Sequence, residues 1–141
     1  MSRDFNIAVD VVAPPERVWA VMSDVEKWPE WTASVKRIHK LDKGPLQIGS
    51  RAIVRQPKLP PALWKVTELK PDYSFAWKST GPGFSVIGTH SVEGRAAGSH
   101  VSLSLRFEGL FGGLAGRLTS GLNRHYLQLE AAGLKRRVEQ S

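Results

Sequence analysis

Cysteine is absent from the 141-residue sequence, and long apolar runs are absent too. Without cysteine the chain forms no disulfide, no thiolate zinc site and no cysteine nucleophile, and such a composition is typical of a reducing compartment. No stretch approaches the roughly 18 apolar residues of a membrane span, and no apolar stretch of signal-peptide length follows Met1. These absences predict a cytoplasmic protein.

Sequence motifs for nucleotide binding and for common catalytic sites are also missing. The glycines on either side of Pro82 lack the third glycine and the following helix of a dinucleotide-binding loop, and no glycine loop ends in Lys-Ser or Lys-Thr. The Gly-x-Ser-x-Gly nucleophile elbow does not occur. The four histidines are never closer than ten residues, so they form no local metal-binding motif. We therefore predict no cofactor and no metal ion.

The residues that are present suit one folded domain with an excess of positive charge. Hydrophobic residues make up 41% of the chain and charged residues 23%, which is typical of a globular protein, and the length predicts a single domain over residues 1–141. The formal net charge of +7 suits an acidic partner such as nucleic acid, anionic lipid or an acidic protein. Because the basic residues are dispersed, we predict no nucleic-acid binding, at most a weak contact with an anionic membrane surface, and a monomer or homodimer.

Alternating apolar and polar residues predict strands through most of the first 108 residues. The clearest alternation places Val101, Leu103, Leu105 and Phe107 on one face of a strand and polar residues on the other. Short segments rich in turn-forming residues separate the later strands, which favours antiparallel pairing of neighbours. The predicted strands cover residues 3–12, 34–41, 50–56, 62–69, 74–79, 85–93 and 100–108.

Two short helical segments are predicted between the first two strands. Pro15 is suited to a first helical turn, and Val18 and Met22 then fall on one side of a helix over residues 15–24. Residues 26–31 are too short and too interrupted by proline for a long element, so they predict one further helical turn or a tight corner.

After Gly109 the apolar residues recur at steps of three and four, which is typical of a helix that reaches the C-terminus. The residues of this stripe are Phe111, Leu114, Leu118, Leu122, His125, Leu129 and Ala132. A long amphipathic helix after a run of antiparallel strands predicts an α+β fold in which the apolar face of the sheet closes over the helix.

Glycines are dense at the start of this helix, between residues 109 and 121. An interior glycine costs a helix about 1 kcal/mol relative to alanine, so the segment is either pliable or packed closely against another backbone. In the first case it forms a mobile portal over a cavity, with Phe111 and Leu114 as its apolar lining. The sequence leaves both interpretations open.

One segment resembles the N-terminal part of the polyketide cyclase/dehydrase and lipid-transport superfamily. It consists of residues 13–19 (Ala-Pro-Pro-Glu-Arg-Val-Trp), followed by Asp24, Trp28, Pro29 and Trp31. This superfamily, also called SRPBCC, includes the START domains and pollen-allergen relatives. The predicted order of elements is similar to that superfamily over essentially the whole chain. The resemblance implies a helix-grip fold, in which a curved seven-stranded antiparallel sheet wraps around the C-terminal helix and leaves a ligand cavity between them.

By this resemblance, inward-facing residues of the strands and of the helix would line the cavity. The expected ligand-binding residues are His90, Val101, Leu103, Leu105, Phe107, Phe111, Leu114, Leu118, Leu122, His125, Tyr126 and Leu129. No catalytic residue of the superfamily is fixed enough to transfer to this chain. His90 and His125 are either ligand-binding or proton-transferring groups, or ordinary structural histidines.

The favoured function is the binding or transport of a hydrophobic small molecule, such as a lipid or an aromatic polyketide-like compound. The alternative is a cyclase/dehydratase-type enzyme that uses the same cavity, which requires at least two convergent polar groups with shifted pKa values. Single-strand nucleic-acid binding is disfavoured because packing explains Trp19, Trp28 and Trp31 better than stacking with exposed bases does.

Overall fold

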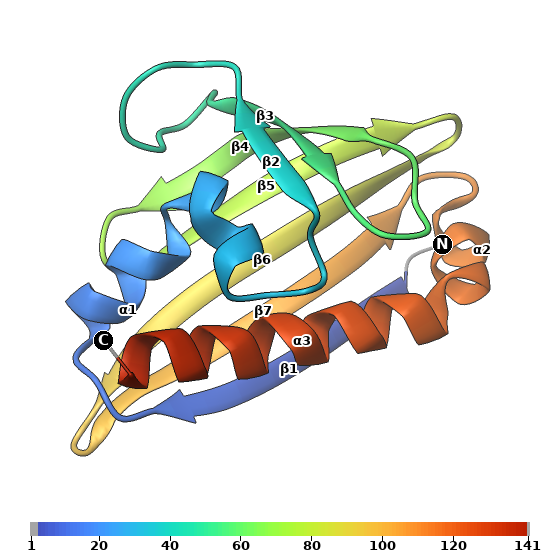
Figure 1. Ribbon diagram of the computed structural model, residues 1–141. Coiled ribbons are helices and arrows are strands. Elements are labelled where there is room, and N and C mark those ends of the chain that lie inside the picture. The colour runs from blue at the N-terminus through green and yellow to red at the C-terminus, as the bar shows by residue number, and fades with distance from the viewer. Residues whose placement is uncertain (1–2, 141) are drawn as a thin grey trace.

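The computed structural model describes residues 3–140, in which a seven-stranded antiparallel sheet curves around a long C-terminal helix (Figure 1). The strands are β1 (Arg3–Val11), β2 (Arg37–Lys40), β3 (Arg51–Arg55), β4 (Ala62–Lys70), β5 (Ser74–Gly81), β6 (Phe84–Arg95) and β7 (Gly98–Glu108). The helices are α1 (Pro15–Met22), the 3-10 helix η1 (Val25–Glu30), α2 (Gly112–Leu118) and α3 (Ser120–Glu139). The predicted α+β helix-grip architecture is confirmed.

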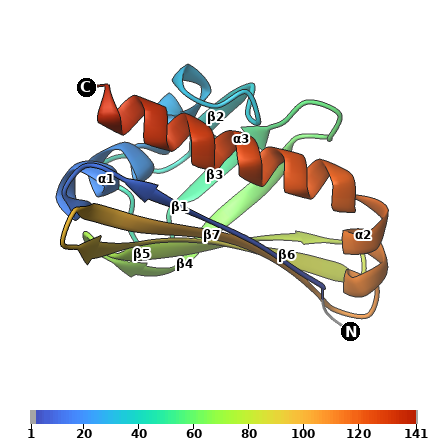
Figure 2. The ribbon, with the colours of Figure 1, turned by 90° about the horizontal axis from the view of Figure 1, so that it is seen from below.

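The strands lie in the order β1-β7-β6-β5-β4-β3-β2, so β1 and β2 form opposite edges of the sheet. Strands β2 to β7 form a meander of neighbouring antiparallel pairs because short connections join them. The connection from β1 to β2 must cross the width of the sheet, and α1 and η1 carry it. These two helices and α3 lie on the same side of the sheet (Figure 2).

The side chains of β7 alternate as the sequence predicts. Val101, Leu103 and Phe107 are buried, whereas Arg106 between them is exposed. On the neighbouring strand β6, His90 is buried together with the residues two positions before and after it. The concave face of the sheet is therefore the apolar face, and it covers the core under α1, η1 and α3.

Two tryptophans hold the corner between α1 and β2 against the core. Trp28 and Trp31 are both buried, and their ring centroids are 5.5 Å apart. The Trp28 indole Nε1 donates a hydrogen bond to the carbonyl oxygen of Met22 at 3.0 Å, which fixes η1 to the end of α1. A large buried ring with one satisfied polar atom is a stable way to close such a short corner.

The predicted single helix after Gly109 is wrong in one respect, because it is divided at Thr119 into α2 and α3. The Thr119 hydroxyl donates to the carbonyl oxygen of Ala115 at 2.8 Å and accepts a hydrogen bond from Asn123 Nδ2 at 2.9 Å. Such local side-chain bonds compete with the regular helical pattern. Within residues 3–140, no helix combines the length and apolarity needed to cross a bilayer.

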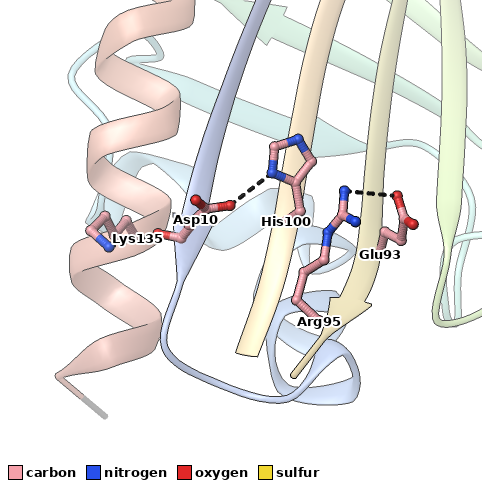
Figure 3. Close-up of polar contacts among 5 residues, drawn as sticks. All are labelled: Asp10, Glu93, Arg95, His100 and Lys135. Carbon is pink, nitrogen blue, oxygen red and sulfur yellow. Dashed lines mark hydrogen bonds and ion pairs between the residues drawn. The ribbon is translucent and has the colours of Figure 1, made fainter. Parts of the chain in front are cut away.

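Polar contacts fasten the C-terminal part of α3 to the sheet edge (Figure 3). Lys135 Nζ donates to the backbone oxygen of Asp10 at 2.6 Å, and the Asp10 carboxylate lies 2.8 Å from His100 Nδ1 on β7. The hydrogen bond with His100 holds the pKa of Asp10 below its usual value. Next to this pair, Arg95 and Glu93 form an ion pair of 3.4 Å. The end of β1 is thus connected to both α3 and β7.

Candidate ligand-binding cavity

A cavity of about 730 Å³ lies between the concave face of the sheet and α3. This volume is within the range of known small-molecule sites, about 300 to 1,000 Å³. Strands on the concave face contribute mainly apolar side chains, and α3 contributes the opposite wall. The apolar lining residues from the strands include Val54, Trp64, Trp77, Val86, Leu103, Leu105 and Phe107. The helix grips the sheet without filling the space between them.

Aromatic rings form much of the inner wall. Trp77 lies between Trp28 and Trp64, with ring centroids 5.6 Å from each of them. Gly88 faces this group from β6, and a Cβ atom built there would lie 3.2 Å from the Trp77 ring. The absence of a side chain at residue 88 therefore leaves room for the indole ring to lie against the strand.

His90 is the polar group at this aromatic wall. Its imidazole stacks on Phe75, with centroids 4.4 Å apart and an interplanar angle of 9°, and lies 5.2 Å from the ring of Trp28. Burial lowers the pKa of His90 to about 3, so the ring is neutral near pH 7. Nδ1 is buried and has no hydrogen-bond partner among the described residues. An unpartnered buried nitrogen on a cavity wall is suited to a polar atom of a ligand or to water.

Glu130 is the carboxyl group of the cavity, and it projects from α3. Burial raises the pKa of Glu130 to about 7, although a hydrogen bond with Ser34 opposes this shift. Glu130 forms no ion pair within the described part of the chain. At neutral pH it is therefore divided between the protonated and ionised forms, which suits a group that gives or takes a proton.

Ser34 links Glu130 to a small polar network behind the cavity wall. The Ser34 and Thr32 hydroxyl oxygens are 2.8 Å apart, and Gln56 Nε2 donates to the Ser34 carbonyl oxygen at 3.2 Å. This network fixes Ser34, and through it the position of the Glu130 carboxyl. Among residues 3–140, no three acidic, histidine or cysteine side chains are grouped closely enough to hold a metal ion.

The cavity extends to one end of the sheet, because three segments that lie at this end contribute residues to its lining. Figure 1 shows these segments near one another. These are residues 56–61 between β3 and β4, residues 81–83 between β5 and β6, and α2. The Tyr126 hydroxyl donates to the carbonyl oxygen of Pro57, and the Phe111 backbone N–H donates to that of Gly83 at 2.8 Å. Hydrogen bonds to backbone carbonyl groups therefore join residues 56–61 to α3, and residues 81–83 to the residue that precedes α2. We call this end of the cavity the opening.

The sequence matches the family model for polyketide cyclase/dehydrase and lipid transport over residues 2–139. The chain belongs to this family. The predicted resemblance is therefore confirmed, and it extends over nearly the whole chain. No curated protein matches this chain in sequence.

Three solved structures with different names are similar to this chain. An aromatase/cyclase from a Streptomyces species has a TM-score of 0.79 at 16% identity, covering 99% of this chain and 95% of its own. A START superfamily protein from Mycobacterium smegmatis has a TM-score of 0.78 at 18% identity, covering 97% of both chains. A norcoclaurine synthase from Thalictrum, in complex with a transition-state analogue, has a TM-score of 0.77 at 12% identity, covering 99% of this chain and 96% of its own. At these identities the likeness concerns the fold.

Five of the residues expected to bind ligand line the cavity of this family member: His90, Leu103, Leu105, Phe107 and Tyr126. Four of them lie on β6 and β7, where the alternation of the strand set their direction correctly. Val101 is fully buried but lies outside the cavity lining.

The remaining expected residues belong to the helical stripe, and none of them lines the cavity. Phe111, Leu114, Leu118 and His125 are exposed, so the prediction that they face the interior is wrong. Leu122 and Leu129 are partly buried outside the lining. The spacing of the large apolar residues predicts that they form the inward face of the helix. In the structure, the inward face of α2 and α3 consists largely of small or polar residues. The inward residues include Gly112, Gly116, Asn123, Tyr126, Leu127, Ala131 and Leu134.

Glu130 and the tryptophans of the inner wall were not among the expected binding residues. A helical phase set by Tyr126, which was expected, places Glu130 one turn later on the same face. The signal for Glu130 was thus present in the sequence, but it conflicted with the stripe of leucines. Trp77 gave no comparable signal, because its strand contains no regular alternation.

Proposed function

We propose that this protein binds and carries a hydrophobic small molecule, such as a lipid or an aromatic polyketide-like compound, between the sheet and α3. The observation that carries the proposal is the cavity of about 730 Å³ with apolar walls and few polar groups. Sites of this kind bind their ligands mainly through apolar contact and orient them by the polar groups. The family, and the fold likeness to a START protein, support the proposal.

The cavity favours a ligand that is uncharged and at least partly aromatic. Trp28, Trp64 and Trp77 contribute indole rings to the lining, and such rings suit contact with a planar aromatic molecule. Neither His90 nor the protonated form of Glu130 offers a charge to a ligand, and an unpaired ligand charge is costly to bury. Each of the two groups can still exchange a hydrogen bond with a hydroxyl or carbonyl.

Fluorescence titration with a neutral apolar dye, N-phenyl-1-naphthylamine, tests the proposal. The double substitution Val86→Trp/Leu105→Trp adds two indole rings to adjacent strands of the cavity wall, and we expect it to weaken dye binding by about tenfold or more. Ile48→Trp is the matched control, because Ile48 is exposed and outside the lining. Wild-type affinity is expected to change little between low and high salt, since apolar burial carries it. Equal binding by the double variant and the control would contradict the proposal.

Native mass spectrometry of protein purified from its own host identifies the natural ligand class. The expected result is a small molecule that remains with wild type and is lost from Val86→Trp/Leu105→Trp. A wild-type sample that carries nothing and also fails to bind the dye argues against a carrier.

A second candidate function is catalysis of the cyclase/dehydratase type, which the carboxyl group of the cavity favours. With a pKa of about 7, Glu130 in its ionised form is suited to take a proton from carbon and, once protonated, to give it to a leaving hydroxyl on the adjacent carbon, which departs as water. His90, with its unpartnered Nδ1, is suited to orient the substrate by a hydrogen bond. The carbon–oxygen and carbon–hydrogen bonds break as a double bond forms. A ligand recovered from wild type that lacks one water relative to that from Glu130→Gln supports catalysis. Identical ligands from both proteins support the carrier function.

A further inference from the structure

Large apolar side chains are concentrated on the outer surface of the opening. Leu110 is 82% exposed, Phe111 52%, Leu114 54% and Leu118 76%, and all four lie within nine consecutive residues. An exposed apolar patch of this kind marks an interaction site in a soluble fold more often than a chance arrangement. We call these four side chains the apolar ridge.

The packing of α2 explains why these residues point outward. A Cβ atom on Gly116 would lie 2.9 Å from the Cβ of Arg3 and 3.1 Å from the ring of Phe107, so this side of α2 lies directly on the sheet. Gly112 is buried on the same side. With glycines facing the sheet, Leu114 and Leu118 are left on the solvent side. The exposure is therefore built into the fold by the glycine positions.

The segments around the opening carry positive charge and no acidic residue. The connecting segments at the opening, residues 56–61, 81–83 and 109–119, contain no aspartate or glutamate. They contain Lys58 and Arg117, which are both exposed, and Arg55 and Arg124 lie close to them along the chain. The neighbouring Glu108 at the end of β7 is paired with Arg106. These segments therefore carry net positive charge.

Lys58 and Arg117, with the neighbouring Arg55, make no ion pair with any described residue. Basic residues elsewhere are often paired, as Arg51 is with Asp42 and Arg137 with Glu30. Unpaired cations beside exposed leucines match the two components of an anionic lipid surface, which are charged headgroups and apolar chains.

We infer that the opening is a docking surface for an anionic lipid bilayer, with the apolar ridge in the interfacial layer and Lys58 and Arg117 among the headgroups. Charge alone would suit an acidic protein equally well. The bilayer is favoured because four large apolar side chains within nine residues, two of them on α2, are exposed to solvent, and a lipid interface accepts them without a matching protein pocket.

Docking in this orientation directs the opening of the cavity toward the membrane. A hydrophobic ligand could then pass between the bilayer and the cavity with little exposure to water, and only this transfer rests on the proposed function. The docking itself does not require a ligand, so vesicle binding and dye binding fail independently of each other.

Vesicle co-sedimentation of the full chain tests the inference. Wild type is expected to bind phosphatidylcholine vesicles that contain phosphatidylglycerol at least about tenfold more strongly than phosphatidylcholine alone, and to lose much of this preference in high salt. Leu114→Ser/Leu118→Ser is expected to lower binding to the anionic vesicles by about tenfold or more. The matched control is Val12→Ser/Ile48→Ser, which removes two side chains that are 73% and 65% exposed elsewhere.

A second pair of variants isolates the charge. Lys58→Glu/Arg117→Glu and Lys43→Glu/Lys70→Glu each lower the net charge by four, but only the first pair lies at the opening. Only the first pair is expected to lose vesicle binding, and both are expected to retain dye binding, because none of the four residues lines the cavity. Equal losses in the two charge variants would overturn the inference. Polyglutamate serves as a model of an acidic protein. The inference also fails if the protein binds polyglutamate as strongly as vesicles and this binding survives Leu114→Ser/Leu118→Ser.

Discussion

At its C-terminal end α3 is bonded to several other segments, whereas at its N-terminal end it meets α2 and the opening of the cavity. Lys135 bonds to Asp10 on β1, Arg137 pairs with Glu30 at 2.7 Å, and the Val12 backbone N–H donates to Glu139 at 2.8 Å. The N-terminal end has apolar residues in solvent and a break at Thr119. One end of the helix is thus tied to the rest of the fold, and the other end lies at the opening of the cavity.

The two ends of α3 therefore differ: the C-terminal end stabilises the fold, and the N-terminal end borders the cavity. A cavity removes packing contacts and costs stability, so the fold must be stabilised elsewhere. In this protein the fully buried side chains of α3 are Leu134 and Val138, at the fastened end. The lining residues Asn123, Tyr126 and Leu127 lie nearer the opening. Regions with few buried contacts are also those that open at low free energy.

The largest expected effect on this comparison comes from Gly133→Ala at the fastened end. A Cβ atom at residue 133 would lie 2.0 Å from the carbonyl oxygen of Trp31, so α3 or the backbone of the corner must shift. We expect a loss of about 3 kcal/mol in the free energy of unfolding. Urea denaturation measures this loss. An unchanged midpoint would show that the C-terminal end of α3 is held less tightly than its contacts indicate.

Hydrogen exchange compares the two ends directly. The amides of α2 are expected to exchange at least about a hundredfold faster than those in the last turns of α3, which corresponds to about 2.8 kcal/mol in opening free energy. This result would support the mobile portal, whereas equal protection would favour the alternative of close packing, for which the contacts of Gly116 with Arg3 and Phe107 provide a basis.

Glu130 lies between the two ends and should make stability depend on pH. Its pKa rises from 4.5 to about 7 on folding, so the folded state binds more protons in this window and stability falls as the pH rises through it. The expected loss is about 2 kcal/mol, and Glu130→Gln should abolish it.

His90 makes folding stability depend on pH in the opposite direction, so its effect must be separated from that of Glu130. Its pKa falls from 6.5 to about 3 on folding, so its contribution is lost as the pH falls from 6.5 toward 3. The Glu130 effect must therefore be read from the difference between wild type and Glu130→Gln, measured by thermal unfolding at each pH. A difference that does not vary between pH 4.5 and pH 7 would mean that the pKa of Glu130 does not rise on folding.

The smallest expected effect comes from Gly121→Ala, near the opening end of α3. No atom lies within 4 Å of a Cβ built at residue 121, so alanine fits without a shift. Its better helix propensity should raise the free energy of unfolding by about 0.5 kcal/mol. Urea denaturation alongside Gly133→Ala makes the two substitutions a matched pair on one helix. A loss of similar size in both variants would remove the distinction between the two ends.

Much of the fold could be predicted because strand alternation and turn residues are local signals. The predicted strand over residues 62–69 corresponds to β4 at Ala62–Lys70, and that over residues 100–108 to β7 at Gly98–Glu108. The strand predicted over residues 34–41 is shorter, at Arg37–Lys40. Strand ends depend on pairing partners, which a local pattern does not contain.

The candidate site could be predicted more fully on the sheet than on the helices, where Tyr126 alone of the expected residues lines the cavity. Leu103, Leu105 and Phe107, which the alternation predicts to face inward, line the cavity, because a strand has only two faces. A helix presents side chains in all directions, and Leu118 and His125 were assigned inward although both are exposed. The physical cause is the packing of Gly116 on the sheet, which the leucine spacing does not reveal.

By itself, the sequence determined the element order, the antiparallel meander and the inward face of β7, because these follow from the period of each segment and the turn residues between them. Only the tertiary structure decided which side of α3 faces the sheet, that Glu130 shares a cavity with His90, and that the exposed leucines lie at its opening. Those features depend on contacts between segments far apart in the chain. Burial and charge proximity arise from such contacts, and no local pattern encodes them.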